Sequence, residues 1–543
     1  MGRPRSSKTI STILSWLAYC DEHHVAGECS ASRQQTAESE MPLLPTRVID
    51  VGLSEYRPPR LILSNGRRGR YATMVHRWGG FNGILTTKST VHEYEGGLPM
   101  MDLPPTFQDA IILTRKLGIQ YLWIDILTIV QDDDEEWIRE AAAFGTIFCN
   151  AYLTIAATSA ADASAGLWYD DRSRNQHIKL DWSSNLPESA CVYMTAYEPF
   201  SFDVLDGSSL YTRAWVMQER ILPRRLLHIG PDQVYWHCDE TFCAENGRRR
   251  FDKSIRSQLL PFWIDEKRFS RNPTPPISTL TLEEIESQLC SAWTQLITAY
   301  TRCSISFSED RLPGLANIAS KIHAKTGLPY HLGHWFGGGG GGSTICSLLW
   351  YASGPAFTRP PLECRPSRTI MPTKIVTPSW SWSSLDGAQS FIMHAMAEDK
   401  AAPHDGFSPL ANVKQVQDPL QVGIALHVPL ILNGYARSAT RAFSMLDSTG
   451  ISQRCYKILL DGTTAGWACF DTDDEPPGTF FCLQMCAAKT KSPVHSTDLT
   501  CIVLLLRRNR VGLPEEYLER IGIGSVSNAN WFATCDRDDF CVV

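Results

Sequence analysis

The sequence lacks the short motifs by which the commonest enzyme folds are recognised. No predicted helix opens with GxGxxG, and the patterns GxxxxGK(S/T), HExxH and GxSxG do not occur. These absences remove the usual signatures of dinucleotide-binding, phosphate-loop, zinc-protease and serine-hydrolase folds. They leave other classes of enzyme open.

The sequence also lacks a long apolar run and an excess of positive charge. No run reaches the length that spans a bilayer, and no small-residue cleavage site follows the apolar stretch Ser11–Cys20. The formal net charge of −7 gives no general attraction to nucleic acid. With 43% hydrophobic and 20% charged residues, the 543-residue chain has the composition of a large globular protein. We therefore expect a cytoplasmic protein with no membrane span and no nucleic-acid partner.

The 17 cysteines never form a CxxC pair. Scattered cysteines in a long chain are typical of reduced thiols that pack as small apolar side chains. One cluster could supply metal ligands: Cys20, His23, His24 and Cys29. No second pair follows at zinc-ribbon spacing, and "SWLAYCDEHH" is typical of the end of an amphipathic helix. We favour the structural helix and expect no metal and no cofactor.

Apolar runs alternate with helical patterns between Tyr71 and Thr158. Helices are predicted from Asp102 to Gly118 and from Asp133 or Asp134 onward. The apolar runs are predicted strands: Tyr71–Val75, Tyr121–Val130 and Tyr152–Thr158. Strands joined through helices of this length are expected to be parallel neighbours with right-handed crossovers. The predicted fold class is α/β, a parallel sheet flanked by helices, and a hairpin over Arg224–Cys238 follows it.

Polar side chains follow these predicted strands at the end where ligands bind in open α/β sheets. His76–Gly80 follow the first strand, Gln131–Asp134 the second and Ser159 the third. The helix after the second strand brings Trp137 and Glu140 to the same edge, with Glu140 bordering the buried stripe. A half-buried carboxyl beside aromatic rings has a raised pKa, which suits acid/base chemistry.

Each carboxylate also has a structural interpretation. Asp125 lies inside a predicted strand, where a carboxylate most often accepts backbone hydrogen bonds or meets a buried arginine. Glu140 can form an ion pair with Arg139 or Arg213. Residues from one short helix, Arg213, Gln218 and Glu219, can form a structural network, and Trp78 and Trp137 can belong to the core.

Several long motifs, in this order, resemble the fungal heterokaryon-incompatibility (HET) domain family. They are "YATMVHRWGG", "LGIQYLWIDILTIVQDDDEEWIREAAAFGTIFCNAYLTIAATSAADASAGL" and "TRAWVMQERILPRRLLHIGPDQVYWHC". The leader "WLAYCDEHH" before "LPTRVIDV", and the later "LLWY" and "TPSWSWSSLDG", are also typical of the family. The resemblance to the domain itself covers Tyr71 to Glu219.

The resemblance implies a role in fungal non-self recognition, in which the domain triggers programmed cell death when unlike hyphae fuse. The family is thought to be distantly similar to TIR domains, some of which cleave NAD through a glutamate that follows a tryptophan. NAD is therefore a possible substrate, Glu140 the implied catalytic residue, and a TIR-like sheet the implied fold. The implied pocket and substrate-binding residues are Trp78, Gly79, Asp125, Gln131, Trp137, Arg213, Gln218 and Glu219.

The chain departs from the family pattern at a few positions. Met74, Val75 and Arg77 replace small polar residues of the first motif, and Ile126 and Thr128 stand where Ser and Cys are usual. Two alternatives to an active enzyme stay open, and these departures bear on the second. One is a non-enzymatic module that associates with itself or with a partner incompatibility protein, and the other is a diverged inactive paralogue.

The patterns divide the chain into five predicted parts. A helical leader that is loosely attached covers 1–45, and the HET domain covers 46–240 with its core at 71–219. A helical extension at 241–335 and a flexible glycine-rich insert at 336–345 follow. A mixed α+β, strand-rich C-terminal region at 346–543 is expected to pack on the HET domain, because its large aromatic side chains need cover.

Overall fold

The computed structural model divides the chain into two units, Met1–Pro276 and Ile277–Val543. The division falls inside the predicted helical extension at 241–335, and the packing of the C-terminal region on the HET domain stays a prediction. Within the described ranges, no helix is both long enough and apolar enough to cross a bilayer. The structure describes residues 6–24, 41–54, 57–79, 84–168, 178–180, 192–194, 205, 207–231, 233–250, 254–263, 277–337, 342–353, 374–375, 377–392, 407–416, 420–422, 425–445, 455–472, 477–489, 499–508, 516–527 and 529–543.

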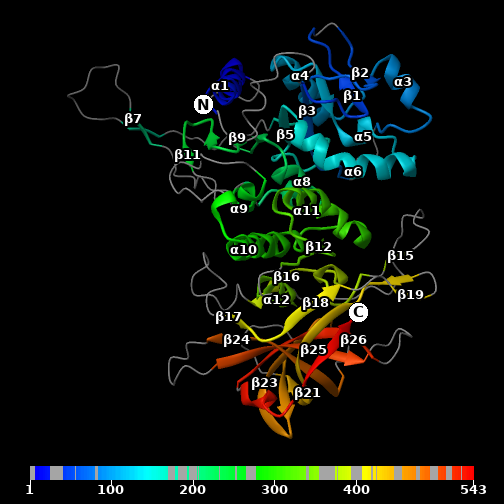
Figure 1. Ribbon diagram of the computed structural model, residues 1–543. Helices are drawn as coiled ribbons and strands as arrows, with labels where there is room; N and C mark the ends of the chain where they lie inside the picture. The colour runs from blue at the N-terminus through cyan, green and yellow to red at the C-terminus, as the bar shows by residue number, and fades with distance from the viewer. Residues whose placement is uncertain are drawn as a thin grey trace. The chain divides into compact units, whose positions relative to one another are not determined.

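Unit 1 contains a mixed sheet flanked by helices (Figure 1). Its helices are α1 (Ser7–His23), α3 (Val91–Gly96), α4 (Pro105–Lys116), α5 (Asp125–Thr128), α6 (Asp134–Asn150), α8 (Val216–Ile221), α9 (Ile255–Leu259), and the 3-10 turns η2 (Ser209–Thr212) and η3 (Leu260–Phe262). Its strands are β1 (Arg47–Asp50), β2 (Arg60–Leu63), β3 (Tyr71–Val75), β4 (Tyr121–Trp123), β5 (Leu153–Ala156), β6 (Ile178–Leu180), β7 (Val192–Met194), β8 (Arg225–Ile229), β9 (Val234–Cys238), β10 (Phe242–Ala244) and β11 (Arg249–Arg250).

The nine strands of the main sheet follow the order β11-β10-β9-β8-β5-β3-β4-β1-β2. The four central strands are parallel, because β3 pairs in parallel with both β4 and β5, and β5 with β8. The flanking pairs are antiparallel, including the predicted hairpin of β8 and β9. The prediction that the first three α/β strands are parallel neighbours is confirmed. The sheet as a whole is mixed, so the expectation of a purely parallel sheet was too narrow.

One predicted strand was wrong in its length. The run Tyr121–Val130 forms only the short strand β4, and the chain then turns into the single-turn helix α5, which begins at Asp125. The turn is closed by bonds from the Thr128 and Ile129 amides to the carbonyls of Ile124 and Asp125. A carboxylate at position 125 needs polar partners, which the end of a strand supplies and its middle does not. The apolar residues that follow are buried on the turn instead.

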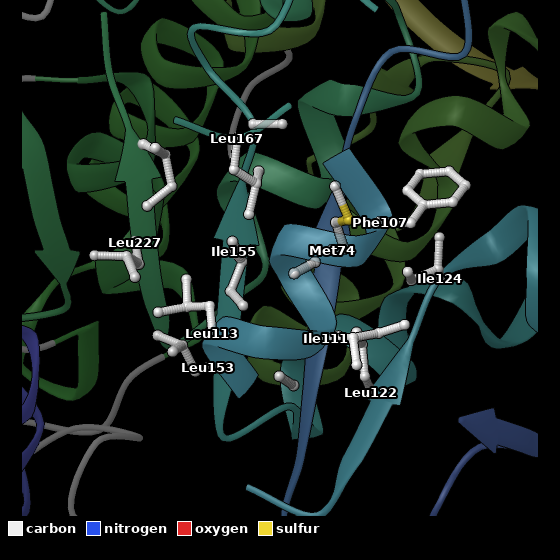
Figure 2. Close-up of a cluster of buried hydrophobic side chains, with 14 of the residues drawn as sticks. Met74, Phe107, Ile111, Leu113, Leu122, Ile124, Leu153, Ile155, Leu167 and Leu227 are labelled. Carbon is white, nitrogen blue, oxygen red and sulfur yellow. The ribbon is translucent and has the colours of Figure 1, made fainter. Parts of the chain in front are cut away.

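Helix α4 covers one face of the parallel sheet. Side chains alternate along each strand, so Met74, Leu122 and Ile155 all point to the same face. Figure 2 shows Phe107 and Ile111 of α4 lying over these side chains. The apolar stripe predicted from the helical spacing is therefore the stripe that builds this core.

Helix α6 belongs to the other face. Trp123 of β4 packs edge-on against Phe144 and Phe148 of α6, with ring centroids 5.3 and 5.7 Å apart. The Tyr71 hydroxyl donates to the Ile147 carbonyl at 2.7 Å, which fixes the helix to β3. The N-cap of α6 is Asp133, whose side chain accepts from the Glu136 amide, as the acidic start of the helix predicts.

The predicted N-terminal helix exists as α1, but it is not loosely attached. Ile13, Leu17 and Cys20 are buried in the same core as β8 and β9. Trp16 lies 6.3 Å from Trp236 between ring centroids, and the Tyr152 hydroxyl donates to Asp21 at 2.6 Å. A sequence pattern shows an amphipathic face but not its partner, so the attachment could not be inferred. Cys29 lies outside the described residues.

The first part of unit 2 is mainly helical. Its elements are η4 (Ile277–Thr279), α10 (Leu282–Tyr300), η5 (Ser308–Arg311), α11 (Pro313–Thr326), β12 (Tyr330–His331), β13 (His334–Trp335), α12 (Gly342–Leu348), β14 (Trp350–Ala352), β15 (Lys374–Ile375), η6 (Trp382–Ser384) and β16 (Gln389–Phe391). Of the predicted glycine insert, 338–341 lie outside the described residues. The aromatic motifs bury Trp350, Trp380 and Trp382 inside this unit.

The rest of unit 2 is a largely antiparallel sheet. Its strands are β17 (Phe407–Pro409), β18 (Asn412–Val416), β21 (Leu430–Met445), β22 (Cys455–Leu460), β23 (Thr463–Phe470), β24 (Thr479–Lys489), β25 (Leu499–Arg508), β26 (Tyr517–Val526) and β27 (Arg537–Val542). The 3-10 turn η7 (Ala529–Phe532) lies between β26 and β27. The short strands β19 (Leu420–Val422) and β20 (Ala425–His427) belong to a separate small sheet, in which β20 pairs with both β15 and β19. The long strand β21 pairs with both β22 and β24, so the sheet closes on itself.

Candidate functional site

The candidate site lies where the central parallel strands of unit 1 end. The chain order of these strands is β3, β4, β5 and β8, whereas their order in the sheet is β4-β3-β5-β8. The order therefore reverses between β3 and β5, which is the topological switch point at which open α/β sheets bind ligands. The loops after β3, β4 and β5 all leave the sheet at this edge, since the strands are parallel.

The loop after β3 places one histidine inside and one tryptophan outside. His76 is buried, and its ring packs edge-on against Phe107 with centroids 4.8 Å apart. Trp78 is 36% exposed, which is unusual for so large an apolar side chain. Gly79 has a φ of +68°, and a Cβ added there would lie 2.4 Å from the Cβ of Asp162. Glycine is thus required where the loops after β3 and β5 approach each other.

Asp125 is the polar centre of this edge. One carboxylate oxygen accepts from the Ile126 amide at 2.8 Å, and the other accepts from the Trp78 indole nitrogen at 3.3 Å. His76 Nδ1 lies 3.7 Å from the first oxygen. Of the two structural interpretations offered by the sequence, backbone hydrogen bonding is correct. The same carboxylate also orients the exposed Trp78.

Arg213 and Glu219 reach this edge from the segment that contains α8. Arg213 Nη1 donates to the His76 carbonyl at 2.7 Å, and Glu219 is buried. Burial raises the pKa of Glu219 to about 8; the Arg213 charge opposes this rise and the Asp125 charge adds to it. His76, Trp78, Asp125, Arg213 and Glu219 together form what we name the carboxyl-edge cluster.

Burial shifts the pKa values of His76 and Glu219 in opposite directions. Burial lowers the pKa of His76 to about 4, although the Asp125 charge works against this, so the imidazole is neutral at neutral pH. Glu219 keeps its proton at the same pH because its pKa is raised. The two carboxyl groups, Asp125 and Glu219, lie in contrasting environments, one partly exposed and one buried. Such a pair can divide the roles of charge stabiliser and proton donor.

Glu140 has different neighbours. It is buried on α6, and burial raises its pKa, as the sequence led us to expect. Its carboxyl is hydrogen-bonded to Thr46, and the charges that act on it belong to Glu136, Arg139 and Arg47. The charges that act on Glu219 belong to Arg213 and Asp125. The structure therefore brings Glu219 together with Asp125 and Arg213, and groups Glu140 with residues next to β1.

The environment of Glu140 is a structural network. Glu136 forms an ion pair with Arg47 and accepts a bond from the Val130 amide at 3.0 Å. These contacts fasten the start of α6 to the first residue of β1 and to the turn after α5. A structural ion pair was one alternative that the sequence left open for Glu140, and Arg139 and Arg47 are the cations near it. The catalytic role of Glu140 stays a prediction.

The remaining predicted residues support the edge. Gln131 donates from its side-chain amide to the carbonyls of Asp125 and Ile129, at 3.2 and 3.1 Å, and so holds the α5 turn. Trp137 packs edge-on against Trp215 with ring centroids 6.2 Å apart, which joins α6 to the start of α8. Gln218 is fully buried on α8 beside Glu219. These contacts are consistent with positioning roles.

The sequence did not single out two histidines near this edge. His76 follows the first predicted strand, and its place directly after β3 is a usable signal. His228 lies inside β8, where its Nδ1 is 2.7 Å from the Tyr211 hydroxyl and 3.4 Å from the Thr158 hydroxyl. Nothing in the hairpin pattern marks His228, because its partners come from other parts of the chain.

The strand order and the polar cluster define an α/β domain with a candidate binding edge. Residues 71–219 match the family described as "Heterokaryon incompatibility protein (HET)", so the chain carries a domain of that family, as the sequence motifs predicted. The match begins with the first residue of β3, ends at Glu219, and contains every member of the carboxyl-edge cluster. No curated protein and no solved structure matches the chain.

Proposed function

We propose that this protein is a heterokaryon-incompatibility effector, which triggers cell death in fungal non-self recognition, and that its carboxyl-edge cluster cleaves NAD as some TIR domains do. The family match supports the first part. The second part rests on one observation, the buried carboxyl of Glu219 beside Arg213 and Asp125 at the switch point of the parallel strands.

The carboxyl groups and the exposed tryptophan of the cluster suit a cationic ring as its ligand. The nicotinamide ring of NAD carries a positive charge, and a cation near Glu219 would offset the desolvation that keeps its proton bound. The exposed Trp78, held by Asp125, offers an aromatic face on which a flat cationic ring can stack. Trp215 precedes Glu219 by about one helical turn. This is the same order, a tryptophan and then a glutamate, as in the TIR domains that cleave NAD.

The proposed reaction is a hydrolysis. The bond between nicotinamide nitrogen and ribose carbon breaks, the nitrogen keeps the electron pair, and water supplies oxygen to the sugar. On ligand binding Glu219 releases its proton to solvent, and its carboxylate stabilises the positive charge that develops on the ribose; the proton returns to Glu219 when the products leave. The products are nicotinamide and ADP-ribose, and the proton of the attacking water is released.

The test compares two carboxyls in the full-length chain. Purified wild-type protein is incubated with NAD and nicotinamide release is measured, together with Glu219→Gln and Glu140→Gln variants whose folding is checked by circular dichroism. We expect release by wild type and by Glu140→Gln, and none by Glu219→Gln. Loss in Glu140→Gln alone would confirm the prediction made from the sequence and refute the role of Glu219.

Expression in a fungal host tests the effector role separately. We expect the wild type to be toxic and Glu219→Gln to be tolerated at equal protein level. Equal toxicity of both, with no nicotinamide release by the wild type, would contradict the enzymatic proposal and favour a self-associating, cytoplasmic signalling module. A wild type that neither kills nor cleaves would indicate a diverged inactive paralogue.

A further inference from the structure

Two cysteines and a histidine from distant parts of the chain meet inside unit 1. Cys20 and His24 lie at the end of α1, one helical turn apart, and Cys238 is the last residue of β9. All three are buried, and their possible ligand atoms lie within 4.8 Å of one another. From this geometry we infer that Cys20, His24 and Cys238 bind a zinc ion that joins α1 to the sheet.

The distances fit a tetrahedral metal. His24 Nδ1 lies 3.1 Å from the Cys20 sulfur and 3.5 Å from the Cys238 sulfur. Zinc bonds of ~2.3 Å to sulfur and ~2.0 Å to nitrogen, at tetrahedral angles, place nitrogen and sulfur about 3.6 Å apart. The three groups therefore need only small shifts to take up zinc geometry. They leave one position of the tetrahedron for a fourth donor.

The surroundings of His24 suit a metal ligand. Its Nδ1 faces both sulfurs, and its Nε2 faces Glu240 Oε2 at 3.8 Å. A ligating histidine commonly directs its second ring nitrogen to a carboxylate, which fixes the ring and the tautomer.

The Cys20 sulfur has a cationic neighbour. Arg225 Nε donates to the Cys20 sulfur at 3.2 Å. Arg225 also pairs with Asp21, so its charge is compensated. Two thiolates with one imidazole select zinc over the hard cations magnesium and calcium.

The bound ion would have a structural role. The sequence separation between His24 and Cys238 is 214 residues, so the ion would tie the N-terminal helix to the hairpin that borders the parallel strands. Binding to the folded form alone stabilises it, and removal of the ion is expected to lower the melting temperature of unit 1 by several degrees. The site lies outside the carboxyl-edge cluster and does not depend on the proposed NAD cleavage.

Metal content of the full-length chain, purified under reducing conditions without chelator, is the decisive measurement. We expect about one zinc per chain by mass spectrometry of the metal. Cobalt introduced in its place should give the near-ultraviolet charge-transfer band of thiolate ligands and the visible bands of a tetrahedral ion. Cys20→Ser and Cys238→Ser should lose the zinc and weaken the band, whereas Cys238→His, which keeps a ligand, should retain zinc.

Cys243→Ser is the matched control. Cys243 is buried in the same core cluster, and its thiol lies outside the group of three ligand atoms, so the variant should keep its zinc. Two wild-type results would overturn the inference: a chain without zinc that gives no thiolate band with cobalt, or a Cys20–Cys238 disulfide in the reduced preparation. Zinc retained by folded Cys20→Ser and Cys238→Ser variants would also overturn the inference. Should these variants fail to fold, the wild-type zinc content and cobalt spectrum decide.

Discussion

Replacing Glu219 with glutamine should change how the stability of unit 1 depends on pH. The pKa of Glu219 rises from 4.5 in the unfolded chain to about 8 in the folded one. A raised folded pKa gives stability that is complete below pH 4.5 and is lost as the pH rises through 8. Glutamine keeps the shape and has no proton to lose, so Glu219→Gln should lack this loss.

The informative window is pH 6.5 to 8. The pKa of His76 falls from 6.5 to about 4, so its contribution is lost in the opposite direction, as the pH falls from 6.5 toward 4. Above pH 6.5 the loss of stability caused by Glu219 is therefore not mixed with the contribution of His76. Integrating the Glu219 contribution from pH 6.5 to 8 gives a loss of about 1.5 kcal/mol in the free energy of unfolding, relative to Glu219→Gln. For a unit of this size the loss corresponds to roughly 3–6 °C in melting temperature.

Differential scanning calorimetry at several pH values measures this difference. Groups common to both proteins cancel in the comparison, so the pH-dependent part reports Glu219. Glu135→Gln, at an exposed position of α6, is the control and should follow the wild type. Melting temperatures of wild type and Glu219→Gln that run parallel from pH 6.5 to 8 would refute the raised pKa of Glu219 in the folded protein.

Three further substitutions test other parts of the structure by thermal or chemical unfolding. Thr281→Ala removes the capping box at the start of α10 and should cost about 1 kcal/mol. Arg520→Ala leaves the buried Asp471 carboxylate, 3.1 Å from Arg520 Nε, without its cation and should cost about 3–5 kcal/mol; a cost under about 1 kcal/mol would contradict the buried pair. Gly79→Ala strains a positive φ and meets Asp162, so it should cost about 1–3 kcal/mol and reduce nicotinamide release; wild-type behaviour would show that the loops do not touch.

Local patterns predicted the elements that local chemistry decides. Helical spacing located α4 and its buried stripe, and the acidic start of α6 is the cap that the sequence indicated. Alternation of strands and helices gave the parallel neighbours β3, β4 and β5, because crossover connections admit few arrangements. The strand predicted from Tyr121 to Val130 was too long because a buried strand and a buried turn have the same apolar composition. Asp125, the one residue that departs from it, marks the place where the strand ends.

The choice between Glu140 and Glu219 shows where local patterns stop. Both carboxyls are buried, both have raised pKa values, and each follows a tryptophan in a helix, so composition and spacing do not rank them. They differ in their neighbours: Glu140 is hydrogen-bonded to Thr46 beside β1, and the charges that act on Glu219 belong to Arg213 and Asp125 at the switch point. Glu140 lies about 90 residues after Arg47, and Glu219 about 90 residues after Asp125. Only the completed sheet brings each pair together. The same holds for Cys238, whose meeting with Cys20 and His24 depends on α1 packing against β9. In this chain, long-range contacts decide which titratable and ligand groups lie close enough to act together.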